Sequence, residues 1–358
     1  MALLPDFVEE GWPSMDLFAE MIRARAGRYA TLVEPMPAYR RVFAGRVKGG
    51  ANLDRVLNRY RFYPRVVRGV QADAYLIPDH SYAHLVHALP AERTGVVCHD
   101  INAFRSLLEP KREPRPWWFR RMMKPILGGL QKARWVFADS EDTRAELLRF
   151  AVVPDDHIRV VPPAAAPEFT AFDPHAPALP WLDELAGSPW LLHVGSCVPR
   201  KRIDVLLNVF AGLRRTMPNL KLVKIGGEFS ADHKAILDRE HLAGAIVHRL
   251  GLSRSELAEV YRRAAVVLMP SDHEGFGLPV LEASACGTAV VASDLPIFRE
   301  VGKTAIRYAP VGDVAVWATV VKQVLDGDAP QREARLALAA GHTWDDYTRI
   351  VLSTLLGH

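Results

Sequence analysis

Short apolar runs alternate with longer stretches whose apolar residues recur every three or four positions along the 358-residue chain. The short runs predict buried β-strands, and the longer stretches predict amphipathic helices. The predicted strands are 2–4, 29–33, 74–77, 94–98, 135–138, 157–161, 190–194, 221–225, 246–248, 264–269 and 288–292. The predicted helices are 15–26, 141–150, 203–216, 231–241, 255–264, 279–287, 314–325, 332–340 and 344–356. This strand–helix alternation favours parallel sheets covered by helices, an α/β class.

A stiff segment interrupts this rhythm near the middle of the chain. Residues 162–180 contain six prolines, which helices and central strands do not accommodate. A chain of this length also exceeds what one hydrophobic core usually holds. We therefore expect two domains, 1–180 and 181–342. Because ligands of parallel sheets bind beyond the carboxyl ends of the strands, we expect the two sheets to share one site in a cleft between the domains.

Composition narrows the class of protein only a little. The 49% apolar and 24% charged residues are typical of globular proteins, and a net charge of +4 selects neither nucleic acid nor membrane. The three cysteines, Cys98, Cys197 and Cys286, show no CxxC spacing, which predicts a reducing compartment and no structural zinc. No apolar run reaches the length of a membrane span, and the start lacks the features of a secretion signal. We expect a cytoplasmic protein.

The most informative stretch is 271–287, which joins two predicted buried strands through a glycine loop and a helix start. Gly275 and Gly277 let the backbone approach a ligand, and the free N–H groups of a helix start favour an anion such as phosphate. Glu274 and Glu282 flank this loop. Carboxylates there are suited to sugar hydroxyls, because each carboxylate oxygen can accept a hydrogen bond from a hydroxyl group. The alternative is a solvated Glu274 and a Glu282 that only stabilises the helix start.

A basic cluster follows another predicted strand. Gly195 ends that strand, and Arg200, Lys201 and Arg202 lie at the start of the next helix. Each charge-assisted bond to a phosphate oxygen contributes about 1.5–3 kcal/mol. A purely structural surface cluster is the less favoured alternative, because the helix dipole repels cations at this end.

Residues 274–294 resemble, almost position for position, the signature of glycosyltransferase family 4, a retaining group with the GT-B fold. The resemblance implies two Rossmann-like βαβ domains facing across a cleft, with a C-terminal helix, 343–358, that packs back on the N-terminal domain. It assigns the E-x7-E pair to Glu274, near the donor sugar and diphosphate, and Glu282, on the nucleotide ribose. It implies that the loop amides bind the sugar and phosphates, at Gly275, Phe276, Gly277 and Leu278.

Residues 194–207 resemble the same family's Gly-loop-Arg-Lys segment, which places Lys201 and Arg200 on the leaving diphosphate and Gly195 beside it. Many relatives carry an arginine directly after the glycine, where this chain has Ser196. Either Arg200 substitutes for that arginine, or the cationic pair is incomplete.

Two further donor contacts are implied by the resemblance. Base recognition is expected from backbone near Leu250. Gly11 occupies the first strand–helix loop, where relatives often have paired glycines near the donor phosphates, whereas Trp12 follows it here.

The strand end His99-Asp100 resembles the family's His-Asp, where the histidine faces the reaction centre. By residue chemistry alone, a single strand-end histidine is more often a hydrogen-bonded structural group. The segment 79–84 follows another strand and predicts acceptor contacts from His80, Tyr82 and His84, beside Asp100. The alternative for that segment is helix capping by Asp79 or Ser81.

Residues 111–124 carry six basic side chains against one acid, a local net charge of 6 − 1 = +5, interleaved with aromatic residues. Such a patch suits an anionic membrane surface, with tryptophans at headgroup level. The alternative is a helix whose aromatic residues pack inward. The residues proposed for the patch are Arg115, Trp117, Trp118, Arg120, Arg121 and Lys124.

These patterns together predict a retaining hexosyltransferase that moves a sugar from GDP-mannose or a UDP-sugar to a saccharide or lipid-linked acceptor in bacterial polysaccharide or glycolipid assembly. No cofactor, metal or nucleic acid is expected, and the enzyme would be cytoplasmic or peripheral on the inner face of the membrane. Two alternatives are a catalytically inactive nucleotide-sugar-binding GT-B protein and a phosphorylase-like GT-B enzyme with a pyridoxal-phosphate lysine.

Overall fold

The computed structural model describes residues 1–185 and 187–357, which divide into two compact units. Unit 1 comprises Met1–Pro163 together with Trp344–His358, and unit 2 comprises Ala164–Thr343. The division falls at the start of the proline-rich segment, whereas the sequence-based boundary was placed at its end. Each unit has its own hydrophobic core.

Unit 1 is built on a five-stranded parallel sheet in the order β1-β2-β3-β4-β5. The strands are β1 (Ala2–Leu3), β2 (Tyr75–Ile77), β3 (Thr94–Cys98), β4 (Trp135–Ala138) and β5 (Ile158–Val160). Because all strands run the same way, the loops that follow them meet at one edge of the sheet.

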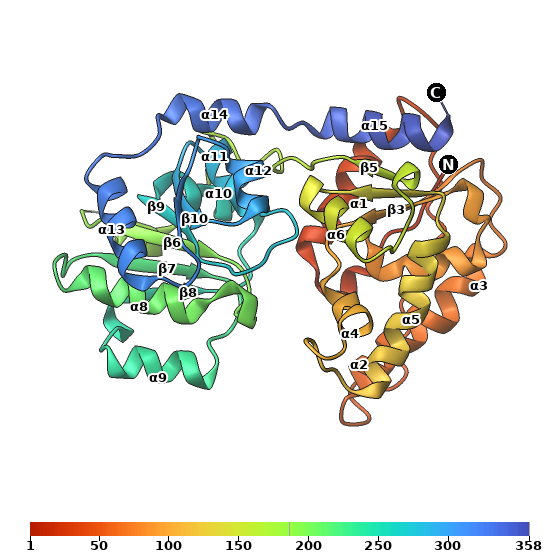
Figure 1. Cartoon of the computed structure of the whole chain (residues 1–358), viewed down its shortest axis with the longest axis horizontal. Coiled ribbons are helices and arrows are strands. Elements are labelled where there is room, and N and C mark those ends of the chain that lie inside the picture. Colours follow the sequence, from red (N-terminus) through yellow and green to blue (C-terminus); the bar gives the residue numbers. More distant parts are fainter. Residues whose placement is uncertain (186, 358) are drawn as a thin grey trace. The chain divides into compact units, whose positions relative to one another are not determined.

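Helices on both sides complete unit 1 (Figure 1). They are α1 (Pro13–Ala26), α2 (Gly50–Leu57), α3 (Tyr63–Val67), α4 (Arg105–Leu108), α5 (Trp117–Lys132), α6 (Glu141–Arg149) and α15 (Trp344–Leu356). Short 3₁₀ or π turns are η1 (Val8–Glu10), η2 (Asn58–Phe62), η3 (His80–Ala88), η4 (Ala91–Arg93), η5 (Asn102–Phe104) and η6 (Asp155–His157). The predicted packing of the C-terminal helix on the first domain is confirmed, since Phe18 of α1 contacts Trp344 and Tyr347 of α15 edge-on, at centroid distances of 5.2 and 5.7 Å.

Unit 2 contains a six-stranded parallel sheet in the order β11-β10-β9-β6-β7-β8. Its strands are β6 (Trp190–Val194), β7 (Lys221–Ile225), β8 (Ile246–Arg249), β9 (Val266–Met269), β10 (Ala289–Ser293) and β11 (Arg307–Ala309). The order reverses direction after β6, so the loops that follow β6, β7 and β9 are neighbours. This is the kind of topological switch point at which α/β sheets bind ligands.

Figure 1 shows this sheet between two layers of helices, with α8 (Ile203–Arg214) on one side and α10 (Arg254–Arg263), α11 (Leu278–Ala285) and α12 (Pro296–Gly302) on the other. The remaining elements are α7 (Pro180–Asp183), η7 (Pro199–Lys201), α9 (Ala231–Arg239), η8 (Ala243–Ala245), α13 (Val314–Leu325) and α14 (Arg332–Ala340). The helix predicted after the glycine loop is confirmed. Gly287 lies just past its end with a φ of 76°, the left-handed conformation that suits a glycine there.

The prediction of a strand at 29–33 is wrong. Residues 28–30 continue the last turn of α1 through hydrogen bonds to carbonyls of Arg25 and Ala26, and only Val33 pairs with β1, as an isolated bridge to Ala2. Pro35 and Pro37 follow directly and lack the N–H groups that a strand would need. The short helices between 50 and 67 and the edge strand β11 were not predicted.

Two adjacent glycines of α5 differ in how closely the helix meets its neighbour, so they form a matched pair for a stability test. A β-carbon at Gly129 would lie 1.9 Å from the Ala83 carbonyl oxygen, whereas one at Gly128 would lie 3.6 Å from the His87 ring. Gly129→Ala should therefore destabilise the protein by about 1–3 kcal/mol through overpacking. Gly128→Ala should be neutral or stabilising by up to about 1 kcal/mol, because alanine favours the helix. Urea unfolding midpoints measure both, and equal midpoints would contradict the close α5–η3 contact.

Candidate functional site

In unit 2, the loops that follow β6, β7 and β9 form a tightly packed backbone layer. A β-carbon at Gly227 would lie 2.5 Å from the Cys197 amide nitrogen and 2.7 Å from the Ser196 Cα, so only glycine fits there. Gly195, with a φ of 147°, sits beside the Lys201 side chain, whose Cε would be 3.5 Å from an added β-carbon. The predicted glycine loop after β6 therefore lies directly against the predicted lysine.

Two predicted cations converge on the carboxylate of a third predicted residue, Glu274, in this layer. Lys201 Nζ donates to Glu274 Oε1 at 2.5 Å, and Arg200 Nη1 donates to Glu274 Oε2 at 2.6 Å and to the His273 carbonyl at 3.0 Å. Ser271 Oγ also donates to Oε1, at 2.6 Å. Lys201 and Glu274 are both buried, with 7% and 5% of their surface exposed. Burial alone raises the pKa of Glu274, but the charges of Lys201 and Arg200 outweigh it and lower the pKa to about 2.

The trio therefore carries two cations and one carboxylate, a net charge of +1. Arg200 and Lys201 come from η7 after β6, and Glu274 comes from the loop after β9, so their ion pairs connect two neighbouring strand ends. A diphosphate needs more positive charge than this, which it would gain from the backbone N–H groups at the start of α11.

Lys224 was missed by the sequence analysis. This lysine of β7 is fully buried, and its ammonium donates to the Gly195 carbonyl at 2.7 Å, to the Ile225 carbonyl at 3.1 Å and to the Gly226 carbonyl. Burial lowers its pKa to about 8. A charged residue between Val223 and Ile225, in the apolar middle of an interior strand, was the signal that could have found it.

Glu282, on α11, accepts a hydrogen bond from the buried Tyr261 hydroxyl at 2.8 Å. Burial raises its pKa to about 7, although the Tyr261 bond acts in the opposite direction. Tyr261, from α10, was also not predicted. Unlike Glu274, which is held by cations, Glu282 lacks a close ion-pair partner among the described residues, so it is the carboxylate with room for hydroxyl donors.

The remaining donor-side predictions occupy different surroundings. Gly277 caps α11 with a φ of 91°, and a β-carbon there would meet the Phe298 ring at 2.8 Å, which explains the glycine. Phe276 is buried near the His342 ring, whereas Gly275 and Leu278 are half-buried.

Two predicted donor residues of unit 2, Ser196 and Leu250, are exposed, the latter by 49%. Gly11 belongs to unit 1, is exposed and has a φ of 70°.

In unit 1, His99 lies at the end of β3 and is buried. Its Nδ1 bonds Asp139 Oδ2 at 2.7 Å, and its Nε2 bonds the Pro78 carbonyl at 3.0 Å. Burial lowers the pKa of His99, but the Asp139 carboxylate and its hydrogen bond raise it to about 9. A ring with both nitrogens bonded to acceptors is an imidazolium, so His99 supplies a fixed positive charge at the strand end while both its N–H groups are engaged.

The residues predicted on the acceptor side are mostly engaged within unit 1. Tyr82 is fully buried and bonded to Glu10 at 2.9 Å, and His84 Nε2 bonds the Arg59 carbonyl at 2.8 Å. The buried His80 ring accepts the His99 amide at 3.3 Å.

The two aspartates near these residues accept hydrogen bonds from backbone amides two positions along the chain. Asp100 accepts the Asn102 amide at 2.8 Å. Asp79 caps η3 by accepting the Ser81 amide at 2.7 Å, so the capping alternative for Asp79 is confirmed.

The basic aromatic patch lies on α5 and the segment before it. Trp117 and Trp118 are 76% and 54% exposed, while Met123, Ile126 and Leu130 form the buried face of the same helix. The alternative in which the aromatic residues pack inward therefore fails for both tryptophans and holds only for Phe119, which is half-buried against the core. Arg115, Arg121 and Lys124 are exposed and Arg120 is half-buried. Over the described residues, α5 and the other helices are all too short or too polar to span a membrane.

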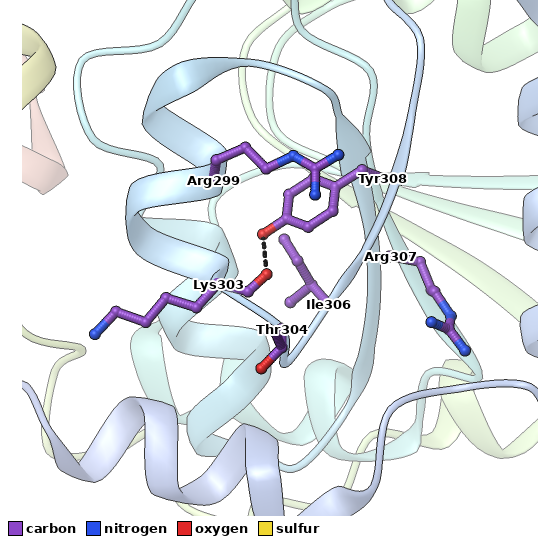
Figure 2. A pocket seen from close by; sticks show the side chains of 6 residues that line it. All are labelled: Arg299, Lys303, Thr304, Ile306, Arg307 and Tyr308. Atoms are coloured by element: carbon purple, nitrogen blue, oxygen red, sulfur yellow. Dashed lines mark hydrogen bonds between the residues drawn. The ribbon is translucent and has the colours of Figure 1, made fainter.

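An open pocket in unit 2 lies away from these residues (Figure 2). Arg299, Lys303, Arg307 and Tyr308 line it, near the amino end of β11 rather than the carboxyl end of a strand. Arg299 forms a bidentate pair with Asp294, Arg307 pairs with Asp328, and the Tyr308 hydroxyl donates to the Lys303 carbonyl at 2.7 Å. Its two arginines are thus neutralised locally, which makes it a poor candidate for a donor site.

This chain is similar in sequence to known glycosyltransferases. Residues 183–340 match the sequence profile of the family described as "Glycosyl transferases group 1". The chain is similar to O-antigen chain mannosyltransferase B of Escherichia coli, with 30% identity over 273 residues that cover 74% of this chain and 70% of that protein. It is also similar to D-inositol 3-phosphate glycosyltransferase of an Arthrobacter species, with 32% identity over 69% of this chain and 61% of that protein.

Longer relatives and a solved structure extend the comparison. The chain spans about a third of the length of the matching WbdA mannosyltransferases of Escherichia coli (35% in one of them, at 26% identity). Among solved structures, Anabaena HepE, in complex with UDP and glucose, superposes with a TM-score of 0.76 at 13% identity, over all of this chain and 99% of that one. At that identity the likeness concerns the fold alone, and the fold is GT-B, as predicted. The profile match and the mannosyltransferase relative together place this chain in the glycosyl transferases group 1 family, so it is a glycosyltransferase.

Proposed function

We propose that this enzyme transfers a hexose from a nucleotide-diphosphate sugar to a hydroxyl group of a saccharide or lipid-linked acceptor, with retention of anomeric configuration. The observation that carries the proposal is the convergence of buried Lys201 and half-buried Arg200 on the buried Glu274 carboxylate, beside the Gly195 loop and the start of α11. Fixed cations and backbone N–H groups at one point are what a departing diphosphate requires.

In the proposed reaction, the bond between the sugar C1 and the diphosphate oxygen breaks and the acceptor oxygen bonds C1 on the same face. The acceptor proton passes to the departing phosphate oxygen. Lys201, Arg200 and the α11 amides stabilise the charge that develops on the diphosphate, and Glu274 holds both cations in place beforehand. Because these cations are preorganised, no metal or other cofactor is invoked in the proposal.

The donor is proposed to be GDP-mannose or a UDP-sugar, and the pathway bacterial polysaccharide or glycolipid assembly. The mannosyltransferase relative supports the first donor, and UDP in the HepE complex supports the second class. A thermal-shift screen of GDP-, UDP- and ADP-sugars tests this. A ligand present at about a hundred times its dissociation constant adds roughly 2.7 kcal/mol of stability, so the true donor should stand out.

Lys201→Met should lower kcat by about 10²–10³-fold, because it removes one cation from the leaving diphosphate. The measurement is transfer, or donor hydrolysis without acceptor, with the donor selected by the screen. Lys234→Met is the matched control, since Lys234 is an exposed lysine of α9 in the same unit.

Unchanged turnover in Lys201→Met would contradict the proposed role. Nucleotide-sugar binding by the wild type without any turnover would instead support the inactive-protein alternative. Turnover that depends on inorganic phosphate and pyridoxal phosphate would support the phosphorylase-like alternative.

Glu282 makes donor binding depend on pH. If the ribose hydroxyls donate to the Glu282 carboxylate, binding requires its proton to leave, and the pKa of the free group is about 7. The dissociation constant of the nucleotide sugar should therefore rise about tenfold between pH 8 and pH 6. Isothermal titration in buffers of different ionisation enthalpy should also detect release of a proton near pH 6.

Glu282→Gln isolates this effect, because it leaves other titrating groups such as Lys224 in place. Its binding should be weaker than that of the wild type above pH 7 and should lack the extra loss below pH 7. If the dissociation constants of the wild type and of Glu282→Gln changed with pH in parallel, Glu282 would not be the residue that binds the ribose.

We propose further that the basic patch on α5 brings the enzyme to an anionic membrane surface, where a lipid-linked acceptor would reside. The exposure of Trp117 and Trp118 beside Arg121 and Lys124 supports this, since amphipathic tryptophans and cations suit the headgroup layer.

Removing two cations from the patch should weaken binding to phosphatidylglycerol-containing vesicles by about thirtyfold, because each contributes about 1 kcal/mol near an anionic surface. Arg121→Gln with Lys124→Gln is the variant, and vesicle sedimentation at low and high salt is the measurement. Phe172→Ser, which removes a 77% exposed aromatic ring of unit 2, is the control. Equal vesicle binding by the wild type, the double variant and Phe172→Ser would exclude the patch as a membrane contact.

A further inference from the structure

Four successive strands of unit 1 are each followed by an aspartate at the same edge of the sheet. Asp6 follows β1, Asp79 follows β2, Asp100 follows β3 and Asp139 follows β4. Three of them have partners within unit 1: Asp79 accepts from Ser81, Asp100 accepts from the Asn102 amide, and Asp139 pairs with His99. Asp6 differs from the other three.

Both carboxylate oxygens of Asp6 are buried, and neither has a hydrogen-bond partner within 1–185 and 187–357. Only 2% of the residue is exposed. An unpaired buried carboxyl group costs free energy, so its presence calls for a compensating ligand or proton. Glu10 Oε2, in the next turn, is likewise buried with no partner, while its Oε1 accepts the Tyr82 hydroxyl at 2.9 Å.

The backbone on both sides of Asp6 is fixed. The Tyr63 hydroxyl donates to the Pro5 carbonyl at 2.8 Å, and the Phe7 amide donates to the Tyr82 hydroxyl at 3.3 Å. Phe7 also packs against both tyrosine rings, with centroids at 5.3 and 6.3 Å. The protein therefore presents the Asp6 carboxyl group from a rigid support, as preorganised binding groups are presented.

The charges around Asp6 are negative. Burial and, to a smaller extent, the carboxylates Asp79, Asp16 and Glu10 together raise its pKa to about 7. The guanidinium of Arg59 is paired with Glu10 at 3.1 Å. A cluster of carboxyl groups repels a phosphate group. It suits neutral hydroxyls, which donate hydrogen bonds to carboxylate oxygens.

A metal ion is a weaker explanation. Hard cations take six or more oxygen ligands, or several carboxylates at short range. Across the described residues, no three or more His, Cys, Asp or Glu side chains are grouped so that they could hold a metal ion.

We propose that Asp6 binds a hydroxyl group of a neutral saccharide acceptor, with Glu10 Oε2 as a second acceptor atom, and that this subsite disfavours phosphorylated polyols. The inference rests on the proposed glycosyl transfer to an acceptor hydroxyl and adds the chemical class of that acceptor. It concerns unit 1 alone, whereas the donor residues tested above belong to unit 2.

The test compares two acceptor probes, octyl α-D-mannopyranoside and D-myo-inositol 3-phosphate, with the donor selected by the thermal-shift screen. The wild type should glycosylate the mannoside and use the phosphate poorly. Asp6→Asn should raise the KM for the mannoside about ten- to hundredfold, the effect of losing a hydrogen bond to a charged group. Donor binding and donor hydrolysis should stay unchanged.

Asp73→Asn is the matched control, since Asp73 is exposed and lies before β2, at the opposite end of that strand. Asp6→Ser is a second variant, and melting temperatures confirm folding. A mannoside KM that is unchanged in Asp6→Asn, or failure of both variants to fold, would assign Asp6 to structure alone and overturn the proposal.

The other outcomes separate this proposal from the proposed function. Preference for the inositol phosphate, or transfer to neither probe while donor hydrolysis persists, would overturn the neutral-saccharide class and leave the donor assignment standing. Loss of all donor binding and hydrolysis in the wild type would instead overturn the proposed function itself.

Discussion

The buried carboxylate of Glu274 is the constraint on which the cationic cluster of unit 2 depends. It joins η7, after β6, to the loop after β9 through ion pairs of 2.5 and 2.6 Å with Lys201 and Arg200. Within buried pairs, removing one charge leaves the other without compensation and typically costs about 3–5 kcal/mol. The segment containing η7 therefore cannot easily move away from the β9 loop, and the two cations are held in place before any ligand arrives.

The buried Lys224 side chain is a second constraint on the same loops. The buried ammonium of Lys224 donates to the carbonyls of Gly195 and Gly226, so the turns after β6 and β7 share one cation. These bonds satisfy carbonyl groups that would otherwise be buried without a partner. The close approach at Gly227 completes this arrangement, since any side chain there would force the two turns apart. Lys224 thus holds the backbone of the two turns, whereas Lys201 is bound to the Glu274 carboxylate.

Much of this could be predicted from the sequence, and the exceptions have physical causes. The Gly-rich loop, the start of α11 and Lys201 are short-range features with distinctive residue types, so local pattern was sufficient. The pairing of Lys201 with Glu274 joins residues 73 positions apart, and only the sheet order β9-β6 brings them together. The strand predicted at 29–33 failed because a hydrophobic run does not reveal that α1 continues into a turn there and that Pro35 and Pro37 follow. The burial of Tyr82 and His84 likewise depends on η3 packing against α5, which the sequence around 80–84 does not encode.

Glu274 in unit 2 and Asp6 in unit 1 are buried carboxyl groups with opposite surroundings, and this contrast bears on function. In unit 2, Glu274 is saturated by two cations and a hydroxyl, which lowers its pKa to about 2 and keeps it ionised at every physiological pH. In unit 1, Asp6 lies among other acids, and burial brings its pKa to about 7. A carboxylate that holds cations for an anionic ligand must remain charged, whereas a carboxyl group that meets neutral hydroxyls gains by having unused acceptor atoms. Glu274 is thus fully bonded among cations, whereas Asp6, within the part of the chain that the structure describes, is unbonded among acids, and these surroundings match the proposed anionic donor and the proposed neutral acceptor.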